Sequence, residues 1–183
     1  MGQALASKNY YYETTGAVTH NLWDKLVFDS VKDSVGGNVR LMLTGSAPIS
    51  PDVLKFLRIC FCCPIIEGYG QTENCAAAFF THPEDKEAGH CGAPIPCIEY
   101  MLKDIAEMSY YSTDKDEEGN PAPRGEICLR GGNCFVGYFK NPEETAKTVD
   151  SEGWIHTGDV GMRLPHNGGL QIIDRYKNIF KLA

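Results

Sequence analysis

The sequence predicts an α/β fold followed by a small, β-rich subdomain. One observation is the order strand, helix, strand between residues 39 and 69, in which small residues follow each apolar strand. The other is a change after about Glu84, where Gly and Pro recur every few residues and helical periods become rare. We therefore assign residues 1–85 to the α/β part and residues 86–173 to the β-rich subdomain.

Composition narrows the class of protein. The 183 residues are 43% apolar and 22% charged, which is typical of ordinary globular proteins. The net charge is −7 and no run of five Lys or Arg residues occurs, so a nucleic-acid partner is not expected. No apolar run approaches the length of a transmembrane span.

The eight cysteines lie mostly in apolar segments. No Cys-x₂-Cys pair is followed by a second one at zinc spacing, and the histidines show no metal spacing either. The chain length and the lack of a signal peptide argue against a secreted disulfide scaffold. We interpret the cysteines as reduced core thiols, which favours a cytosolic compartment.

The first segment should be a frayed helix end or a loop, and a helix should follow it. Residues 3–18 are polar and rich in tyrosine without a clean period, so we expect a frayed helix end or a loop there. From Thr19, a plausible N-cap, a helix should run to Gly36. Its apolar face consists of Trp23, Leu26, Val27 and Val31.

Residues 39–44 are predicted to form a mostly buried strand, and a second strand should begin at Pro64. Between them, Ser50 as N-cap and Pro51 at the first helical position open a helix through about Cys60. Val53, Leu54 and Leu57 should lie on one face of this helix. Strand, helix and strand imply a parallel pair, which brings the loops that follow both strands to one edge of the sheet.

The second half reads as strands and loops with one helix. Asn141 followed by Pro142 predicts a short helix that ends before Gly153. The other expected elements are a turn at residues 92–96, a strand within 97–108, an acidic loop at 113–124 and a half-buried strand at 126–130.

Residues 67–73, Glu-Gly-Tyr-Gly-Gln-Thr-Glu, carry the chemistry of a nucleotide site. The glycines allow backbone close to a ligand, and Tyr69 offers a flat face for stacking a base. Thr72 offers a donor to phosphate, and Glu73 offers a hard oxygen ligand for Mg²⁺. The alternative is a strand end that runs into a turn.

A second segment, residues 153–177, adds two polar groups. Asp159 lies next to Gly158, where we expect a tight turn. The Asp159 carboxylate could then accept hydrogen bonds from vicinal hydroxyls, such as those of a ribose. Arg175 ends an alternating strand and offers a planar donor fork for the same sugar. The alternative is an Asp-Gly turn and a surface arginine.

Three segments resemble, in their order and spacing, motifs of the adenylate-forming superfamily. They are residues 67–73, Thr157-Gly158-Asp159 and Asp174-Arg175. Within it the chain is most similar to the long-chain fatty acid–CoA ligases, on the strength of residues 40–50, Glu67 and the run from Gly153 to Lys177. The resemblance covers roughly residues 15–183 and implies that the chain is part of the large AMP-binding domain of such an enzyme.

The resemblance implies two half-reactions. A fatty carboxylate attacks the α-phosphorus of ATP to give acyl-adenylate and pyrophosphate, and coenzyme A then displaces AMP. Tyr69 would stack on adenine, Thr72 would hold the α-phosphate and Glu73 would bind Mg²⁺. The other implied positions are Gly45, Ser46, Ala47, Glu67, Gly68 and Gly70 in the nucleotide cleft, Asp159 and Arg175 on the ribose, and Lys177 at the hinge.

Two parts of the family pattern are missing, namely the Ser/Thr/Gly-rich phosphate loop and the C-terminal lid with its catalytic lysine. We therefore expect a piece of a larger enzyme that is inactive in isolation, with residues 174–183 as the hinge to the lid. Tyr176 departs from the polar residue common at its position. The parent is expected to be cytoplasmic, or peripheral on the cytosolic face of an organelle membrane such as the endoplasmic reticulum.

Three alternatives stay open from the sequence. The first is a non-catalytic nucleotide-binding or scaffold module, and the second is a ligase for medium-chain or aryl acids. The third is a hydrolase that uses Ser46, His156 and Asp159, which the lack of a Gly-x-Ser-x-Gly elbow disfavours.

Overall fold

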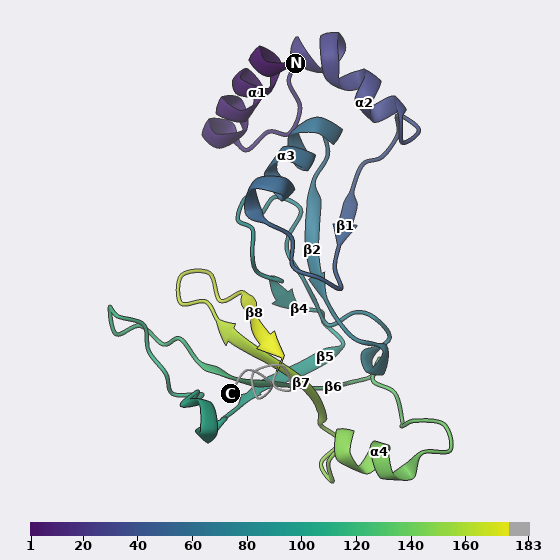
Figure 1. Cartoon of the computed structure of the whole chain (residues 1–183), viewed down its shortest axis with the longest axis vertical. Helices are drawn as coiled ribbons and strands as arrows, with labels where there is room; N and C mark the ends of the chain where they lie inside the picture. Colours follow the sequence, from purple (N-terminus) through teal and green to yellow (C-terminus); the bar gives the residue numbers. More distant parts are fainter. Residues whose placement is uncertain (176–183) are drawn as a thin grey trace. The chain divides into compact units, whose positions relative to one another are not determined.

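The structure is a computed structural model that describes residues 1–175, except for the side chain of Asp174. It consists of two compact units, drawn in Figure 1. The first comprises Met1–Glu67 with His82–Gly89, and the second comprises Gly68–Thr81 with the chain from His90 onward. The segment around Phe79 belongs to the second unit because it packs in that unit's core. The predicted domain limits at residues 85 and 173 stay predictions.

The first unit contains three helical segments and a parallel strand pair. Strand β1 pairs with the first part of β2 in the parallel sense that we expected, with Thr44 opposite Glu67. The elements are α1 (Gly2–Thr15), a π-helical turn (Asp24–Phe28) that continues into α2 (Asp29–Asp33), β1 (Met42–Thr44), α3 (Pro51–Phe61) and β2 (Ile65–Tyr69).

Most of residues 3–18, predicted as a frayed helix end or a loop, lies in a regular helix, α1, that runs from Gly2 to Thr15. Its buried face consists of Ala4, Lys8 and Tyr12, which follow one another at intervals of four residues. Lys8 is fully buried, and its ammonium lies 2.5 Å from a carboxylate oxygen of Asp24. Because the buried face contains a lysine and a tyrosine, the helical period does not appear in an apolar pattern.

The helix predicted from Thr19 exists but begins later, at Asp24. Val27 packs against the buried Phe28 cluster, as expected for the inward face. Leu26 is 65% exposed, so its assignment to that face was wrong. The π-helical turn at Asp24–Phe28 shifts the angular spacing of side chains, which explains why a strict helical period misplaced Leu26.

Helix α3 confirms the prediction from its cap. The Ser50 side chain accepts a hydrogen bond from the backbone N–H of Val53, and Pro51 occupies the first helical position. Of the residues predicted to share one face, Leu54 is fully buried, whereas Val53 is 47% exposed and lies at the solvent side. Strand β1 was also predicted to be buried, but Leu43 is 59% exposed.

Arg58 on α3 connects four segments of the first unit. Its Nε and Nη2 donate to the carbonyl oxygen of Ile65 at 3.0 and 2.8 Å. Its Nη1 donates to the hydroxyl of Tyr12 and to the carbonyl oxygen of Lys86, both at 3.2 Å. The residue is 3% exposed, so these acceptors have little access to water. The guanidinium therefore holds α1, β2 and the Lys86 segment against α3.

We predict that Arg58→Ala lowers the free energy of unfolding by about 2 to 4 kcal/mol, because it leaves buried acceptors without a donor. Urea denaturation of the chain measures this change. Arg40→Ala removes an exposed arginine from the same unit and should change stability by less than about 0.5 kcal/mol. Equal unfolding midpoints for the two variants would contradict the role of Arg58.

The second unit is β-rich, as predicted. Four antiparallel strands form a curled sheet in the order β5-β6-β7-β8, shown in teal to yellow in Figure 1. The last two residues of β2 pair with β3, which pairs with β4. The strands are β3 (Phe79–Phe80), β4 (Ala93–Pro94), β5 (Ile98–Lys103), β6 (Arg124–Gly131), β7 (Ile155–Arg163) and β8 (Leu170–Arg175).

One face of the sheet forms the core of the second unit. Phe79 is fully buried, and its ring meets that of Tyr100 edge to face at a centroid distance of 5.0 Å. The other buried residues of this cluster are Ala78, Ile98, Ile127, Leu129, Ile155 and Leu170. This core supports the ends of β2, β7 and β8, where the candidate site lies.

The predicted helix at Asn141 is confirmed as α4 (Pro142–Thr148). The Asn141 side chain accepts a hydrogen bond from the backbone N–H of Glu144, as an N-cap should. Two short 3₁₀ turns, Thr72–Asn74 and Ala106–Met108, complete the unit. Throughout residues 1–175, every helix is too short or too polar to span a bilayer.

A bulge interrupts the pairing of β6 with β7. Glu126 pairs with Val160 and Cys128 pairs with His156, so Ile127 alone lies opposite three residues of β7. These three are Thr157, Gly158 and Asp159. Gly158 has a φ of 69°, a conformation that a glycine adopts without strain. Asp159 therefore lies in a strand bulge, which corrects the prediction of a tight turn.

Candidate functional site

The carboxylate of Asp159 is the centre of the candidate site. Its Oδ2 accepts hydrogen bonds from the Tyr69 hydroxyl at 2.7 Å and from Gln71 Nε2 at 2.5 Å. Its Oδ1 accepts from Arg175 Nε at 3.1 Å. The Asp159 side chain is 5% exposed, whereas that of Arg175 is 68% exposed. The structure thus brings together Tyr69, Asp159 and Arg175, three residues singled out from the sequence.

Two features of the sheet place Asp159. Arg175, at the end of β8, is its direct partner in the β7–β8 pairing. The Thr157 hydroxyl accepts a hydrogen bond from the Asp159 backbone N–H at 3.1 Å and donates to the carbonyl oxygen of Ile127 at 2.7 Å. Thr157 thereby holds the bulge to β6, and the bulge directs Asp159 toward Tyr69.

Gln71 belongs to the candidate site, although no role was predicted for it from the sequence. Its Nε2 donates to Asp159 and also to the carbonyl oxygen of Thr157 at 3.1 Å. Its backbone N–H donates to Oδ1 of Asn74 at 2.9 Å, in a capping box that starts the Thr72–Asn74 turn. An Asn three residues after Gln71 is the sequence signal that could have identified this cap.

The residues flanking Tyr69 have structural roles of their own. A Cβ at Gly70 would lie 2.3 Å from the carbonyl oxygen of Ala76, and one at Gly68 would lie 2.6 Å from the Phe80 ring. Close packing of the chain on itself therefore requires both glycines, independently of a ligand. The buried carboxylate of Glu67 accepts a hydrogen bond from the backbone N–H of Gly89 at 3.0 Å.

Thr72 and Glu73 follow in the 3₁₀ turn, with Thr72 exposed. Glu73 Oε1 accepts a hydrogen bond from the Tyr138 hydroxyl at 2.5 Å, and this bond raises the pKa of Tyr138 above its ordinary value. Glu73 Oε2 makes no hydrogen bond within residues 1–175. Mg²⁺ is commonly held by one or two carboxylates together with substrate phosphates, so Glu73 fits such an ion.

The other predicted positions are not among the residues that bond to Asp159. Gly45, Ser46 and Ala47 are exposed residues of the first unit, and their place in the cleft stays a prediction. Lys177 lies outside the described residues, and so its hinge role is not tested.

The hydrolase alternative loses support because both ring nitrogens of His156 contact carboxylates, at 3.0 Å to Glu126 and 3.3 Å to Asp150.

Burial dominates the electrostatics of Tyr69. It raises the pKa of the phenol far above its ordinary value, and the negative charge of Asp159 raises the pKa further. The phenol therefore stays protonated and donates to Asp159. Because the pKa is higher in the folded chain, the associated stability is fully present below the unfolded pKa and is lost as the pH rises above it.

We predict that the free energy of unfolding falls above about pH 10, by up to roughly 1.4 kcal/mol per pH unit from Tyr69 alone. Urea denaturation between about pH 9 and about pH 11 measures the slope. Tyr69→Phe should flatten this slope, whereas Tyr111→Phe, which removes an exposed phenol, should not. An unchanged slope in Tyr69→Phe would show that the phenol ionises as readily in the folded chain as in the unfolded one.

Comparison with known proteins identifies the class of protein. Residues 9–139 match the family described as AMP-binding enzyme, and the chain therefore belongs to this family. The match includes Tyr69, Gln71 and Glu73 and ends before the β7–β8 pair that carries Asp159 and Arg175.

Curated relatives show which members of this family the chain is similar to. Fatty acyl-CoA synthetase A of Dictyostelium discoideum is 53% identical over 165 residues, which cover 90% of this chain and 24% of that protein. Long-chain-fatty-acid--CoA ligase 1 of Homo sapiens is 49% identical over 181 residues, which cover 98% of this chain and 25% of the ligase. The chain thus spans about a quarter of the length of the curated relatives it matches.

Solved structures agree on the fold. The A domain of a carboxylic acid reductase from Segniliparus rugosus, in complex with AMP and a co-purified carboxylic acid, is 27% identical with a TM-score of 0.66. That alignment covers 96% of this chain and 26% of the A-domain chain. The adenylation domain of a carboxylate reductase from Mycobacterium chelonae is 30% identical with a TM-score of 0.64, over 96% of this chain and 26% of that chain. The predicted fold class, an α/β part and a β-rich part of an adenylate-forming domain, is confirmed.

Proposed function

We propose that the chain is part of an enzyme that activates long-chain fatty acids with ATP and transfers the acyl group to coenzyme A. The fatty carboxylate attacks the α-phosphorus of ATP, pyrophosphate leaves, and the thiol of coenzyme A then displaces AMP. The observation that carries this proposal is the convergence of Tyr69, Gln71 and Arg175 on the Asp159 carboxylate. The long-chain acyl-CoA ligases among the relatives support the choice of substrate.

The Asp159 carboxylate is the proposed acceptor for the ribose hydroxyls. A carboxylate offers about four lone-pair positions on its two oxygens. Within residues 1–175, Oδ2 accepts two hydrogen bonds and Oδ1 accepts the single bond from Arg175. Oδ1 therefore keeps a position for a ribose hydroxyl, and the Arg175 side chain, which is 68% exposed and bonded to Oδ1 through Nε, would lie beside the same sugar.

Tyr69 and Thr72 are proposed to contact the adenine and the α-phosphate of ATP. The hydrogen bond to Asp159 fixes the Tyr69 ring, whose face would stack on adenine. The exposed Thr72 hydroxyl would donate to the α-phosphate. These residues bind and align the reactants, and alignment contributes much of the rate acceleration in a reaction without a protein nucleophile.

Glu73 is the proposed Mg²⁺ ligand. Its Oε2 has no hydrogen-bond partner among residues 1–175, and its position directly after Thr72 places it beside the proposed phosphate contact. A bound Mg²⁺ would supply positive charge that stabilises the phosphates. Tyr138 holds the Glu73 carboxylate through Oε1 and so fixes its orientation.

The compartment is part of the proposal. All eight cysteines are free thiols, which supports a reducing, cytoplasmic setting. A long-chain fatty acid partitions into membranes, so we also propose peripheral association of the parent with the cytosolic face of an organelle membrane such as the endoplasmic reticulum. Fractionation of cells, with the protein followed by antibody, tests this placement.

Acid-dependent release of AMP by the full-length protein tests the proposed function. Palmitate should support AMP release in the presence of ATP, Mg²⁺ and coenzyme A, and should do so better than octanoate or benzoate. The 183-residue chain alone should give no release above a control without protein, because it spans 24% of the Dictyostelium relative. A full-length protein that binds ATP but releases no AMP with any acid would favour the non-catalytic alternative.

We predict that Glu73→Gln in the full-length protein lowers adenylate formation by a factor of about 10² or more, the scale for losing one preorganised electrostatic contact. Pyrophosphate release at limiting Mg²⁺ measures the change. Glu143→Gln makes the same substitution at an exposed position of α4 and should leave the rate within about twofold. A near wild-type rate for Glu73→Gln would remove the proposed Mg²⁺ role.

A further inference from the structure

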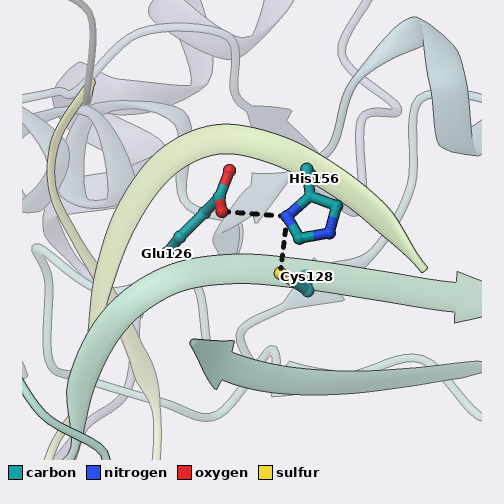
Figure 2. A group of neighbouring side chains, drawn as sticks. All are labelled: Glu126, Cys128 and His156. Atoms are coloured by element: carbon teal, nitrogen blue, oxygen red, sulfur yellow. Dashed lines mark hydrogen bonds and ion pairs between the residues drawn. The ribbon is translucent and has the colours of Figure 1, made fainter. Parts of the chain in front are cut away.

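Three potential metal ligands of different chemistry meet on strands β6 and β7, as Figure 2 shows. His156 Nδ1 lies 3.0 Å from Glu126 Oε2 and 3.6 Å from Cys128 Sγ. The three ligand atoms all lie within 4.8 Å of one another. All three residues belong to the second unit, and none has a part in the proposed nucleotide site.

The strand pairing creates this group, which is why local sequence spacing gave no sign of it. Cys128 and His156 are direct partners across β6 and β7, although 28 positions separate them in the chain. Glu126 precedes Cys128 by two positions on the same strand, so both side chains project from one face. The backbone N–H of Gly158 donates to Glu126 Oε1 at 3.1 Å, which leaves Oε2 toward His156.

The separations suit a tetrahedral cation. Zinc bonds of about 2.3 Å to sulfur and about 2.0 to 2.2 Å to nitrogen and oxygen place sulfur about 3.6 Å from nitrogen, and nitrogen about 3.4 Å from oxygen. The observed distances are 3.6 Å and 3.0 Å. Cys128 Sγ and Glu126 Oε2 lie within 4.8 Å of each other, so movement of the Glu126 side chain would complete three corners of a tetrahedron.

Asp150 supplies the outer support that metal-binding histidines require. Its Oδ2 lies 3.3 Å from His156 Nε2, the ring nitrogen that points away from Cys128 and Glu126. Backbone N–H groups of Glu152 and Trp154 each donate to Asp150 Oδ1 at 2.9 Å and fix the carboxylate. A carboxylate on the second nitrogen orients the ring and makes the first nitrogen a better ligand.

We propose that Glu126, Cys128 and His156 bind one divalent cation of the zinc class, with water at the fourth position. The thiolate and imidazole select a borderline-soft cation over Mg²⁺, so this site is chemically different from the one proposed at Glu73. The side chains of His156, Glu126 and Asp150 are 18%, 20% and 33% exposed, which gives a cation access. The cation ties β6 to β7 beside the bulge that positions Asp159.

The buried Cys128 thiol gives up its proton on binding. Burial raises the pKa of this thiol to about 12, with Glu126 adding to the effect, so the thiol is protonated at neutral pH without a cation. Binding converts the thiol to a metal-bound thiolate and releases one proton to solvent, while no electron is transferred. The alternative is a His156–carboxylate hydrogen-bond network that binds no metal.

Cobalt binding to the full 183-residue chain tests the proposal, in a Cys75→Ser/Cys97→Ser background that removes the two exposed thiols. After treatment with a chelator, the chain should bind one Co²⁺ and show thiolate-to-cobalt charge-transfer absorption, which one equivalent of Zn²⁺ abolishes. Cys128→Ser should remove this absorption. Asp150→Asn should weaken Co²⁺ binding about 10- to 100-fold, whereas Asp52→Asn, at an exposed position of α3, should not change it.

His156→Gln decides the result if Cys128→Ser fails to fold, because it leaves the core thiol in place. It should weaken Co²⁺ binding by more than Asp150→Asn does, with circular dichroism as the check on folding. Absence of saturable Co²⁺ binding by the Cys75→Ser/Cys97→Ser chain overturns the proposal. Thiolate absorption that persists in folded Cys128→Ser, or an unchanged affinity in folded His156→Gln, overturns it as well.

Discussion

The second unit depends on the hydrogen bonds that the buried carboxylate of Asp159 accepts. An unpaired charge with 5% exposure would cost several kcal/mol, so the fold has to supply partners for it. Tyr69, Gln71 and Arg175 supply them from β2, from the loop after it and from β8. The β7 bulge directs the carboxylate toward these donors, and the Phe79 core fixes the strands beneath them.

The same arrangement suits a preorganised nucleotide site. A carboxylate whose orientation is already fixed by protein donors need not reorganise when a ribose hydroxyl reaches its remaining lone pair. Tyr69 takes part in both roles, because its hydroxyl holds Asp159 while its ring would stack on the base. Glu73 repeats this pattern, since Tyr138 holds one carboxylate oxygen and leaves the other for the proposed Mg²⁺. The proposed site thus gives the two carboxylates different roles, Asp159 as the acceptor for the sugar and Glu73 as the ligand of the metal.

The sequence predicted features with strong local signals. Ser50 and Asn141 marked helix starts because their side chains cap a backbone N–H three residues later. Helix α1 escaped prediction because it buries Lys8, whose charge is satisfied by the distant Asp24.

The contacts of Gln71, and those within the group of Glu126, Cys128 and His156, were not predicted because long-range strand pairing and a bulge create them. Tyr69, Asp159 and Arg175 were identified by motif, and their mutual hydrogen bonds are visible only in three dimensions.

The proposed nucleotide site requires that Asp159 accept a hydrogen bond from the ribose of ATP. A double-mutant cycle with ATP and 2′-deoxy-ATP, on wild type and Asp159→Asn of the full-length protein, tests it most directly through the four dissociation constants. Loss of the 2′-hydroxyl should weaken binding to the wild type by about 1.5 to 3 kcal/mol, the range for a hydrogen bond to a charged group, and should weaken binding to Asp159→Asn much less. A coupling energy indistinguishable from zero in folded proteins would contradict the account and leave Asp159 with a structural role alone.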